Sequence, residues 1–271
     1  MTDETLEALA ARAVAGDRAA LGAICAALQE PIYGLAMRML GHPQDAEDAS
    51  QEILVQIATY LSQFQGRSSL LTWAYRIAAR HLVRVRKSRA EAAAREVADV
   101  AVAIDMGLAM TTAQSLPEGD ARVLEEEVRL TCTQAMLLAL SRPERIAYIL
   151  GVVLGADDRT GARICGVSRE AFRQRLSRGR KALEPLLAER CGLADAKNPC
   201  SCARQAAAKQ TLGPIRLRFA ALPRVSGRVA RAVDQLRGLN RAGHVFAIDP
   251  PLAAPEEVWR RICAAVPDLM G

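Results

Sequence analysis

The chain has 271 residues, 51% of them hydrophobic and only 4% aromatic, and its formal net charge at pH 7 is +6. This length can bury the cores of two small domains, and the scarcity of aromatic residues beside abundant Ala, Leu and Arg predicts an all-α protein. An odd number of cysteines, seven, argues against a secreted disulfide framework. The lack of a signal-like leader, or of an apolar run long enough to span a membrane, predicts a cytoplasmic protein with no membrane partner.

The N-terminal segment, residues 1–63, is predominantly acidic, and basic residues dominate from Arg67 onward. Apolar spacing predicts a short helix over residues 4–15 and a longer one over 18–40, in which Pro31 could introduce a bend. Beyond a break at residues 41–43, the run QDAEDASQE of residues 44–52 crowds carboxylates into the first turn of the next helix. The helix dipole alone accounts for carboxylates in that position, whereas an acidic end of the chain would also suit a basic protein surface.

Residues 64–89 combine a glycine-bearing polar loop with a strongly basic helix. We expect an apolar stripe at helical spacing, formed by Leu70, Trp73, Ile77 and either Val83 or Val85. The basic residues of this stretch have no carboxylate between them: Arg67, Arg76, Arg80, Arg84, Arg86, Lys87 and Arg89. Such a helix repels itself unless a polyanion lies nearby, which predicts nucleic-acid binding; a solvated face of a core helix is the alternative. Trp73 and Tyr75 could hold unstacked bases, although Trp73 could equally belong to the core.

Residues 91–124 lose helical periodicity and include the loop-like run SLPEGD, so we expect a linker with at most fragments of helix. A helix resumes at Glu125. Ser141 and Glu144 then have the spacing of a capping box at the start of a further helix.

A helix-turn-helix pattern follows within residues 157–187. It consists of a short helix up to Cys165, a turn at Gly166 and a longer helix capped by Ser168. On the longer helix a buried stripe is expected, made of Phe172, Leu176 and Leu183, and arginines cover its other faces. An ordinary basic αα-hairpin is the alternative interpretation.

Residues 189–271 begin with three thiols around a turn, Cys191, Cys200 and Cys202. Thiolates select zinc or copper(I), so one interpretation is a metal or redox site, for which Cys263, His244 or a partner would supply a further ligand. The alternative is a set of small buried thiols or one incidental bond, and no metal or other cofactor is assigned. Two amphipathic helices are expected later, near residues 225–236 and 258–266.

Three motifs in this order resemble the extracytoplasmic-function (ECF) group of bacterial sigma factors, which bring RNA polymerase to promoters. Residues 45–52 are similar to that family's acidic polymerase-docking helix, residues 64–78 to its segment that opens and reads the −10 element, and residues 140–184 to its −35-binding helix-turn-helix. The resemblance covers about residues 5–188. It implies region 2 over residues 5–90, a linker over 91–124 and region 4 over 125–188, with a helical, cysteine-containing extension over 189–271.

The resemblance also implies roles for individual residues. Those expected to bind core polymerase are Asp45, Asp48, Gln51 and Glu52. Those expected at the −10 element are Gln65, Arg67, Ser68, Trp73, Arg76, Arg80, Arg84 and Lys87. Those expected at the −35 element are Ser168, Arg169, Arg173, Gln174, Arg175 and Arg178. An anti-sigma factor would be a further candidate partner beside polymerase and promoter DNA.

No catalytic role is expected, because His42, His81 and His244 have neither triad nor metal-ligand spacing. The alternative function is a helix-turn-helix regulator that acts without polymerase, but such a protein would have no use for the acidic helix.

Several residues depart from the family's pattern and bear on which promoter is read. Arg80 stands where the family usually has Asn, Arg84 where it often has Asp, and Gln65 where it has Arg. Gly161 replaces a large apolar residue in the first helix of the helix-turn-helix. Glycine costs about 1 kcal/mol of helix propensity relative to alanine, which predicts a weakly formed helix.

Overall fold

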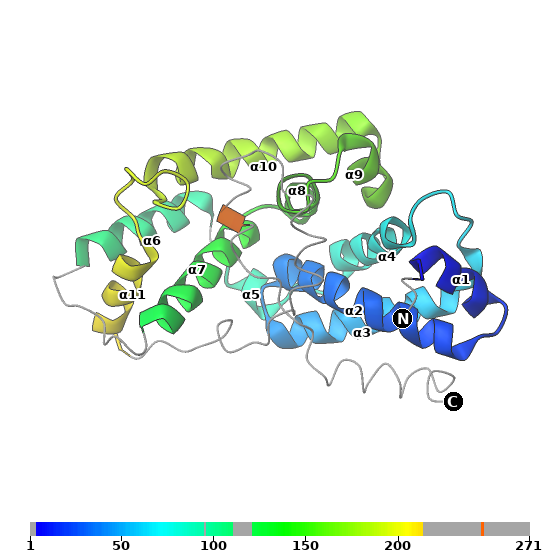
Figure 1. The fold of residues 1–271 in the computed structure, drawn as a ribbon. Helices are drawn as coiled ribbons and strands as arrows, with labels where there is room; N and C mark the ends of the chain where they lie inside the picture. The colour runs from blue at the N-terminus through cyan, green and yellow to red at the C-terminus, as the bar shows by residue number, and fades with distance from the viewer. Residues whose placement is uncertain (1–3, 95, 111–120, 214–244, 247–271) are drawn as a thin grey trace.

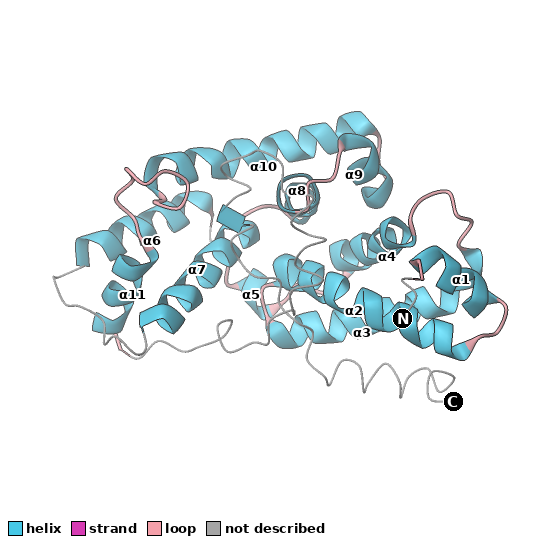
Figure 2. Ribbon diagram, viewed as in Figure 1, coloured by secondary structure: helices cyan, strands magenta, loops and turns pink. Residues whose placement is uncertain are grey.

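The computed structural model describes residues 4–94, 96–110, 121–213 and 245–246 (Figure 1). Within these ranges the regular secondary structure is helical, apart from one isolated bridge between Cys191 and Cys200 (Figure 2). The prediction of an all-α protein is confirmed. The amphipathic helices expected after residue 213, together with Cys263 and His244, lie outside the described residues.

The N-terminal half is a bundle of four helices around α2. Its elements are α1 (Leu6–Val14), α2 (Arg18–Leu40), α3 (Pro43–Tyr60), a 3₁₀ turn (Leu61–Gln63) and α4 (Leu70–Arg84). Asp17 caps α2 by accepting a hydrogen bond from the Ala20 N–H at 3.1 Å. The helix ends at Gly41, whose φ of 69° is a left-handed conformation that favours glycine. The helix continues through Pro31.

By length and composition alone, the 23-residue helix α2 is apolar enough to cross a membrane. The expectation that no run approaches such a length is therefore wrong. Packing accounts for the apolar residues, because Ile24, Leu28 and Ile32 are each 0% exposed in a core shared with α1, α3 and α4.

The second half of the described chain begins with the short helix that follows α4. Its elements are α5 (Arg89–Ala92), α6 (Val97–Met110), α7 (Ala121–Leu138), α8 (Arg142–Tyr148) with a π turn (Ile149–Val153), α9 (Asp158–Cys165), α10 (Arg169–Arg190) and α11 (Cys202–Thr211). The 14-residue helix α6 lies within the expected linker and packs against α7, α10 and α11. Ser141 precedes α8, but its hydroxyl donates to the Glu144 carboxylate at 2.6 Å and caps no helix N–H.

The two halves are in contact (Figure 1). Helix α4 packs against α8 and α9, and α2 packs against α7 and α8. From the extension, Phe246 is 2% exposed and places its ring edge-on to Tyr148 of α8, with the ring centroids 5.5 Å apart. Because α4 packs against α9, the first helix of the helix-turn-helix lies directly on the basic helix α4.

A buried ion cluster joins the halves. The Glu91 side chain is 3% exposed and pairs with Arg142 at 2.6 Å and with Arg145 at 2.7 Å. Both guanidinium groups also donate to backbone carbonyls where helices of the first half end, namely those of Val83, Val85 and Arg86 for Arg142 and that of Met39 for Arg145. The last carbonyls of a helix have no partner within it, so the arginines satisfy groups that would otherwise be orphaned.

Helix α9 forms despite Gly161, because the glycine is needed for packing. A Cβ atom at this position would lie 2.2 Å from Cζ of Phe172, and that ring is 0% exposed. The phenyl ring of α10 thus occupies the space that a large side chain on α9 would fill. The helix is thus present over Asp158–Cys165, and this packing opposes the low helix propensity of glycine.

We expect Gly161→Ala to lower the free energy of unfolding. Alanine gains about 1 kcal/mol of helix propensity, but forcing a methyl group against a fully buried ring costs about 1–3 kcal/mol. Chemical denaturation of both proteins measures the difference. Gly22→Ala is the matched control, because a Cβ at Gly22 in α2 meets nothing within 4 Å; it should be neutral or stabilising. Equal stabilisation by both substitutions would show that Phe172 does not require the glycine.

Candidate nucleic-acid interface

Helix α4 buries a different stripe from the expected one. Its buried apolar side chains on the bundle side are those of Leu70, Ala74, Ala78 and Leu82, each 0% exposed. Trp73 and Ile77 are half-buried at the edge of this stripe. The predicted stripe is therefore confirmed at Leu70 and wrong beyond it, because Ala74 and Ala78 are buried in place of the larger Trp73 and Ile77.

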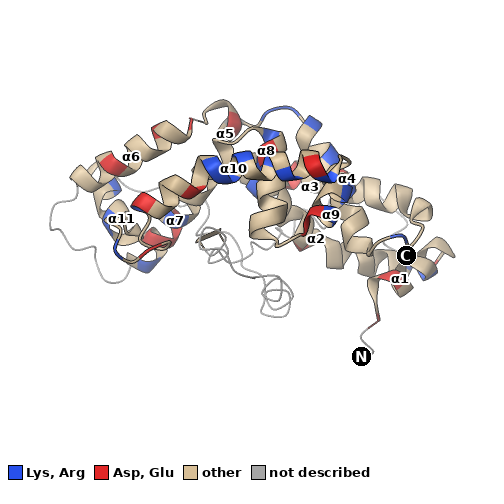
Figure 3. Cartoon of the chain, turned by 90° about the horizontal axis from the view of Figure 1, so that it is seen from above, with Lys and Arg blue, Asp and Glu red and all other residues tan. Residues whose placement is uncertain are grey.

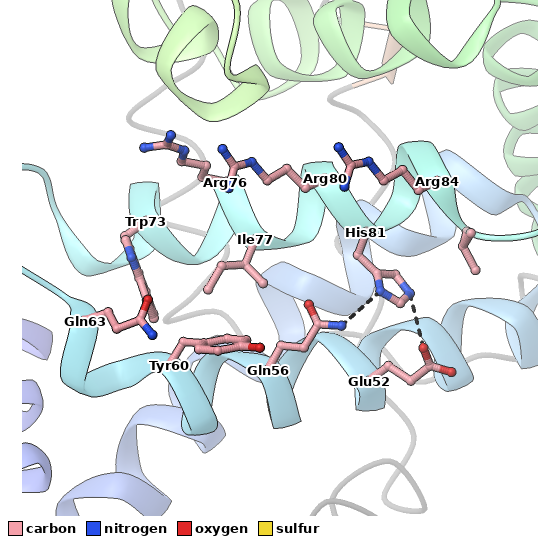
Figure 4. Close-up of a pocket in the computed structure, with 11 residues that line it drawn as sticks. Glu52, Gln56, Tyr60, Gln63, Trp73, Arg76, Ile77, Arg80, His81 and Arg84 are labelled. Carbon is pink, nitrogen blue, oxygen red and sulfur yellow. Dashed lines mark hydrogen bonds and ion pairs between the residues drawn. The ribbon is translucent and has the colours of Figure 1, made fainter.

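This shift places Trp73 and Ile77 in a groove between α3 and α4 (Figure 4). The groove has a volume of about 760 Å³, and its lining includes Gln56, Tyr60 and Gln63 of the α3 side. Trp73, Ile77 and His81 point across it toward α3, whereas Arg76, Arg80 and Arg84 follow one another along the other side of α4. The Trp73 ring also contacts Phe64, with ring centroids 5.7 Å apart. An aromatic wall beside a row of cations is suited to an unstacked base and its phosphate.

His81 joins α4 to α3 inside the groove. The Gln56 amide nitrogen lies 3.3 Å from His81 Nδ1, and the Glu52 carboxylate lies 3.6 Å from Nε2. Donation from the amide to Nδ1 places the ring proton on Nε2, facing Glu52. Burial lowers the pKa of His81, and the nearby Glu52 charge only partly opposes this. The imidazole is therefore neutral at pH 7, and the basic charge of the groove comes from its arginines.

Most of the residues expected at the −10 element are accessible. Exposed side chains are those of Gln65, Arg67, Arg76, Arg80, Arg84 and Lys87, while Ser68 and Trp73 are half-buried. Tyr75 does not line the groove; it packs on the core, and burial raises its pKa to about 12. The aromatic pair expected from the sequence is thus divided, with only Trp73 facing the groove.

The turn and the cap of the helix-turn-helix are built as predicted, and of the expected stripe Phe172 and Leu183 are buried while Leu176 is half-buried. Gly166 has a φ of 66° at the end of α9, and the Ser168 hydroxyl caps α10 by accepting from the Ala171 N–H at 3.1 Å. The remaining candidate residues of α10 are exposed, apart from the half-buried Arg175: Arg169, Arg173, Gln174 and Arg178. Seen from above, several segments of the α10 ribbon are coloured blue for Lys or Arg (Figure 3). This arrangement offers a row of exposed basic residues to a polyanion.

Two contacts organise the basic residues of this half. Asp158 at the start of α9 lies 3.0 Å from Arg169 and 3.5 Å from Arg173 of α10. Arg163 of α9 donates to the Arg67 carbonyl in the loop before α4, at 3.1 Å. A second cavity of about 500 Å³ separates α4 from the turn of the helix-turn-helix. It is lined in part by Arg80, Arg84, Cys165, Gly166 and Arg175.

The acidic candidates lie on α3. Asp45, Asp48 and Gln51 are half-buried, and Glu52 is exposed. Asp45 lies 3.7 Å from His42, with which it pairs only if the imidazole is protonated. Only Glu52 lines the groove beside Trp73 and the arginines. The structure therefore brings one of the expected polymerase-binding residues together with those expected at the −10 element, and leaves the other three on the remainder of α3.

The described cysteines are all free thiols. Cys191 and Cys200 are backbone neighbours, and no group of three or more His, Cys, Asp or Glu side chains in the described ranges is arranged to hold a metal ion as it stands.

Sequence reasoning missed the ion cluster of Glu91, Arg142 and Arg145. Glu91 lies in the expected linker, and nothing in its local sequence distinguishes it from a solvated carboxylate. Arg142 lies between Ser141 and Glu144 of the predicted capping box, and nothing in the sequence around it indicates a buried ion pair. The pairing joins residues about 50 positions apart, which a single sequence does not reveal.

Comparison with known proteins gives a consistent result. The Sigma-70 region 2 family matches residues 25–91. The RNA polymerase sigma-H factor of Pseudomonas aeruginosa is 28% identical over 196 residues, covering 70% of this chain and 99% of that protein. The ECF RNA polymerase sigma factor SigW of Bacillus subtilis is 29% identical over 178 residues, covering 64% of this chain and 91% of that protein.

A solved structure of CnrH in complex with the cytosolic domain of CnrY aligns with a TM-score of 0.47 at 23% identity, covering 66% of this chain and 95% of that chain. The probable RNA polymerase sigma-C factor of Mycobacterium bovis is 30% identical over 189 residues, which cover 67% of this chain and 90% of that protein. By this similarity, the chain belongs to the ECF group of sigma-70 family RNA polymerase sigma factors.

Proposed function

We propose that this protein directs promoter-specific initiation of transcription by binding core RNA polymerase and the −10 and −35 promoter elements. Its curated relatives are named as sigma factors. The observation that carries the proposal is the pairing of two accessible arginine surfaces, one along α4 beside an aromatic groove and one along α10, with a carboxylate-bearing α3. Such a protein works by binding and needs no catalytic residue of its own. Its place of action would be the cytoplasm, where bacterial transcription occurs.

The two DNA-binding surfaces are given different tasks. The groove of α3 and α4 would receive an unstacked −10 base against Trp73, with Arg76 and Arg80 on the phosphates. Helix α10 would enter the major groove of the −35 element from its capped N-terminal end, where Arg169 and Arg173 lie. A regulator that acts without polymerase is not favoured, because its function would leave α3 without a partner.

The proposal requires the two halves to separate. The positions −35 and −10 are about 25 base pairs apart, or roughly 85 Å along duplex DNA at about 3.4 Å per step. In the structure α4 packs directly against α9, so both surfaces cannot reach their elements in this arrangement. We infer that the described state is closed and that polymerase and promoter bind an open state.

Transcription in vitro tests the proposal directly. Purified core polymerase would be combined with this protein and a library of linear promoter fragments, and the transcripts sequenced. We expect transcripts from a subset that shares −10 and −35 motifs, and none from polymerase alone. DNA binding without stimulated transcription would instead support a regulator independent of polymerase.

We expect Arg173→Ala and Arg178→Ala to weaken promoter binding through α10. An arginine that reads a base edge contributes about 1–3 kcal/mol at one promoter position. A phosphate contact instead lowers the salt dependence of binding by about one unit, uniformly across sequences. Titration of labelled −35 duplexes at several salt concentrations separates these two cases.

Arg190→Ala is the control for this series, because it removes an arginine from the far end of the same helix, about 25 Å from Arg173 at about 1.5 Å per residue. It should leave both the sequence preference and the salt slope unchanged. If Arg173→Ala and Arg178→Ala behave like the control, α10 is not the helix that reads the promoter.

A further inference from the structure

We propose that Cys132, Cys191, Cys200 and Cys202 form a binding site for a thiophilic metal ion, with Zn²⁺ as the ion that four thiolates suit best. The site is separate from the surfaces assigned to DNA and polymerase. It is formed by α7 and the start of α11, which pack together, and by the loop that follows α10.

The loop after α10 folds back on itself so that the backbones of Cys191 and Cys200 are neighbours. Cys191 and Cys200 form an isolated β-bridge between their backbones. The Gly192 N–H donates to the Cys200 carbonyl at 2.8 Å, and the Cys200 N–H donates to the Arg190 carbonyl at 3.2 Å. A Cβ on Gly192 would lie 2.5 Å from that carbonyl oxygen, so only glycine permits the approach. The Asn198 amide closes the loop on the helix end by donating to the carbonyls of Leu187, Ala188 and Cys191.

The other two thiols come from facing helices. Ala206 of α11 forms a small buried cluster with Leu124 and Val128 of α7, and the two helices run in opposite directions (Figure 1). Cys202 lies one turn before Ala206, and Cys132 lies one turn after Val128. Antiparallel packing therefore sets Cys202 opposite Cys132. Cys132 is thus the ligand that the sequence alone could not supply.

The four groups also affect one another electrostatically. The pKa of Cys132 is raised to about 12, mainly by burial and in addition by the charges of Cys191, Cys200 and Cys202. Burial, together with the charges of Cys191 and Cys200, raises the pKa of Cys202 to about 11. These mutual effects indicate that the four cysteines lie close together.

Within the described ranges no group of these side chains is arranged around a single point, so the proposal requires the four thiols to turn toward a common centre when the ion binds. Helix α11 is already held in place, since the Gln205 amide donates to the Ile104 carbonyl of α6 at 2.8 Å. A bound ion would tie α7 and α11 to the end of α10, the helix that carries the arginines expected at the −35 element.

The test uses the full-length protein, stripped of metal by a chelator under reducing conditions. We expect it to bind one equivalent of Zn²⁺, and Co²⁺ used as a probe should give the visible absorption of tetrahedral thiolate coordination. Cys132→Ser should weaken Zn²⁺ binding more than about 10-fold, beyond what changes outside the coordination shell usually cause. Cys165→Ser on α9 is the matched control and should bind like the natural protein.

Equal Zn²⁺ affinity of Cys132→Ser and the natural protein would overturn the four-thiol site, and binding of Cu(I) without Zn²⁺ would overturn the choice of ion. A readout on the natural protein guards against a variant that fails to fold. In alkylation mapped by mass spectrometry, Zn²⁺ should protect Cys132, Cys191, Cys200 and Cys202 and leave Cys165 unchanged. Protection that omits Cys132 would also overturn the proposal. None of these readouts depends on transcription, so they remain informative if the proposed function is wrong.

Discussion

Replacing Glu91 with glutamine is expected to lower the free energy of unfolding by about 3–5 kcal/mol, the usual cost of removing one partner from a buried ion pair. The Glu91 side chain is 3% exposed and the Arg145 side chain 4%. Without the carboxylate, the Arg145 guanidinium would remain buried with only neutral carbonyl partners. Chemical denaturation monitored by circular dichroism measures the loss.

Acid provides a second measurement on the unaltered protein. Burial by itself would raise the pKa of Glu91, but hydrogen bonds from Arg142, the Ser88 N–H and Arg145 outweigh it and lower the pKa to about 2. A carboxyl group whose pKa is lower in the folded state contributes stability above its unfolded pKa and loses it as the pH falls. The cluster's contribution, about 3 kcal/mol for a shift of this size, should therefore disappear between about pH 4.5 and pH 2. Glu91→Gln should remove that part of the pH dependence.

Glu96→Gln is the matched control, since it makes the same change at an exposed position a few residues along the chain. It should alter stability by less than about 0.5 kcal/mol. If Glu91→Gln is no more destabilising than this control, the cluster is not an important contact between the halves.

The cluster has a consequence for the proposed opening of the molecule. Its acidic member follows α4, and its two arginines belong to α8 and donate to the carbonyl ends of α2 and α4. Rotation of the helix-turn-helix away from α4 would pull on these bonds. The cluster therefore resists opening, because buried charges must stay paired.

Local signals predicted much of this fold, because helix boundaries depend on neighbouring residues. Apolar spacing predicted α2 over residues 18–40, and Gly166 with Ser168 predicted the turn and the cap of α10. The same signals failed where packing partners decide the outcome. Alanines at 74 and 78 have no strong apolar signature, yet they form the buried face of α4 because α2 and α3 approach closely there.

Long-range contacts were beyond the sequence for a related reason. The role of Gly161 depends on Phe172, that of Glu91 on two distant arginines, and the role proposed for Cys132 on a loop much later in the chain. In each case the residue type is unremarkable where it stands, and its role appears only when the chain brings its partner alongside. The segment 91–124 was similarly expected to be a linker, and α6 gains its stability from α10 and α11.

The substitution Asp48→Lys combined with Gln51→Ala is expected to reduce binding to core polymerase by about 100-fold or more. Both residues lie on α3, in the helix that resembles the polymerase-docking helix of the family. A reversed charge facing a basic partner costs several kcal/mol, and a loss of about 1.4 kcal/mol corresponds to a factor of ten in affinity. A pull-down or fluorescence titration with purified core enzyme provides the measurement.

Two controls make this result specific to α3. Both residues are half-buried outside the core of the bundle, so the variant should keep its helical content and unfolding midpoint within a few degrees of the natural protein. Glu96→Lys, a charge reversal at an exposed position of the second half, should bind polymerase normally. Undiminished binding by the α3 variant would place the docking surface elsewhere. In that case Glu52 would remain part of the groove, where its distance of 3.6 Å from His81 Nε2 suits it to positioning α4 more than to contacting a partner.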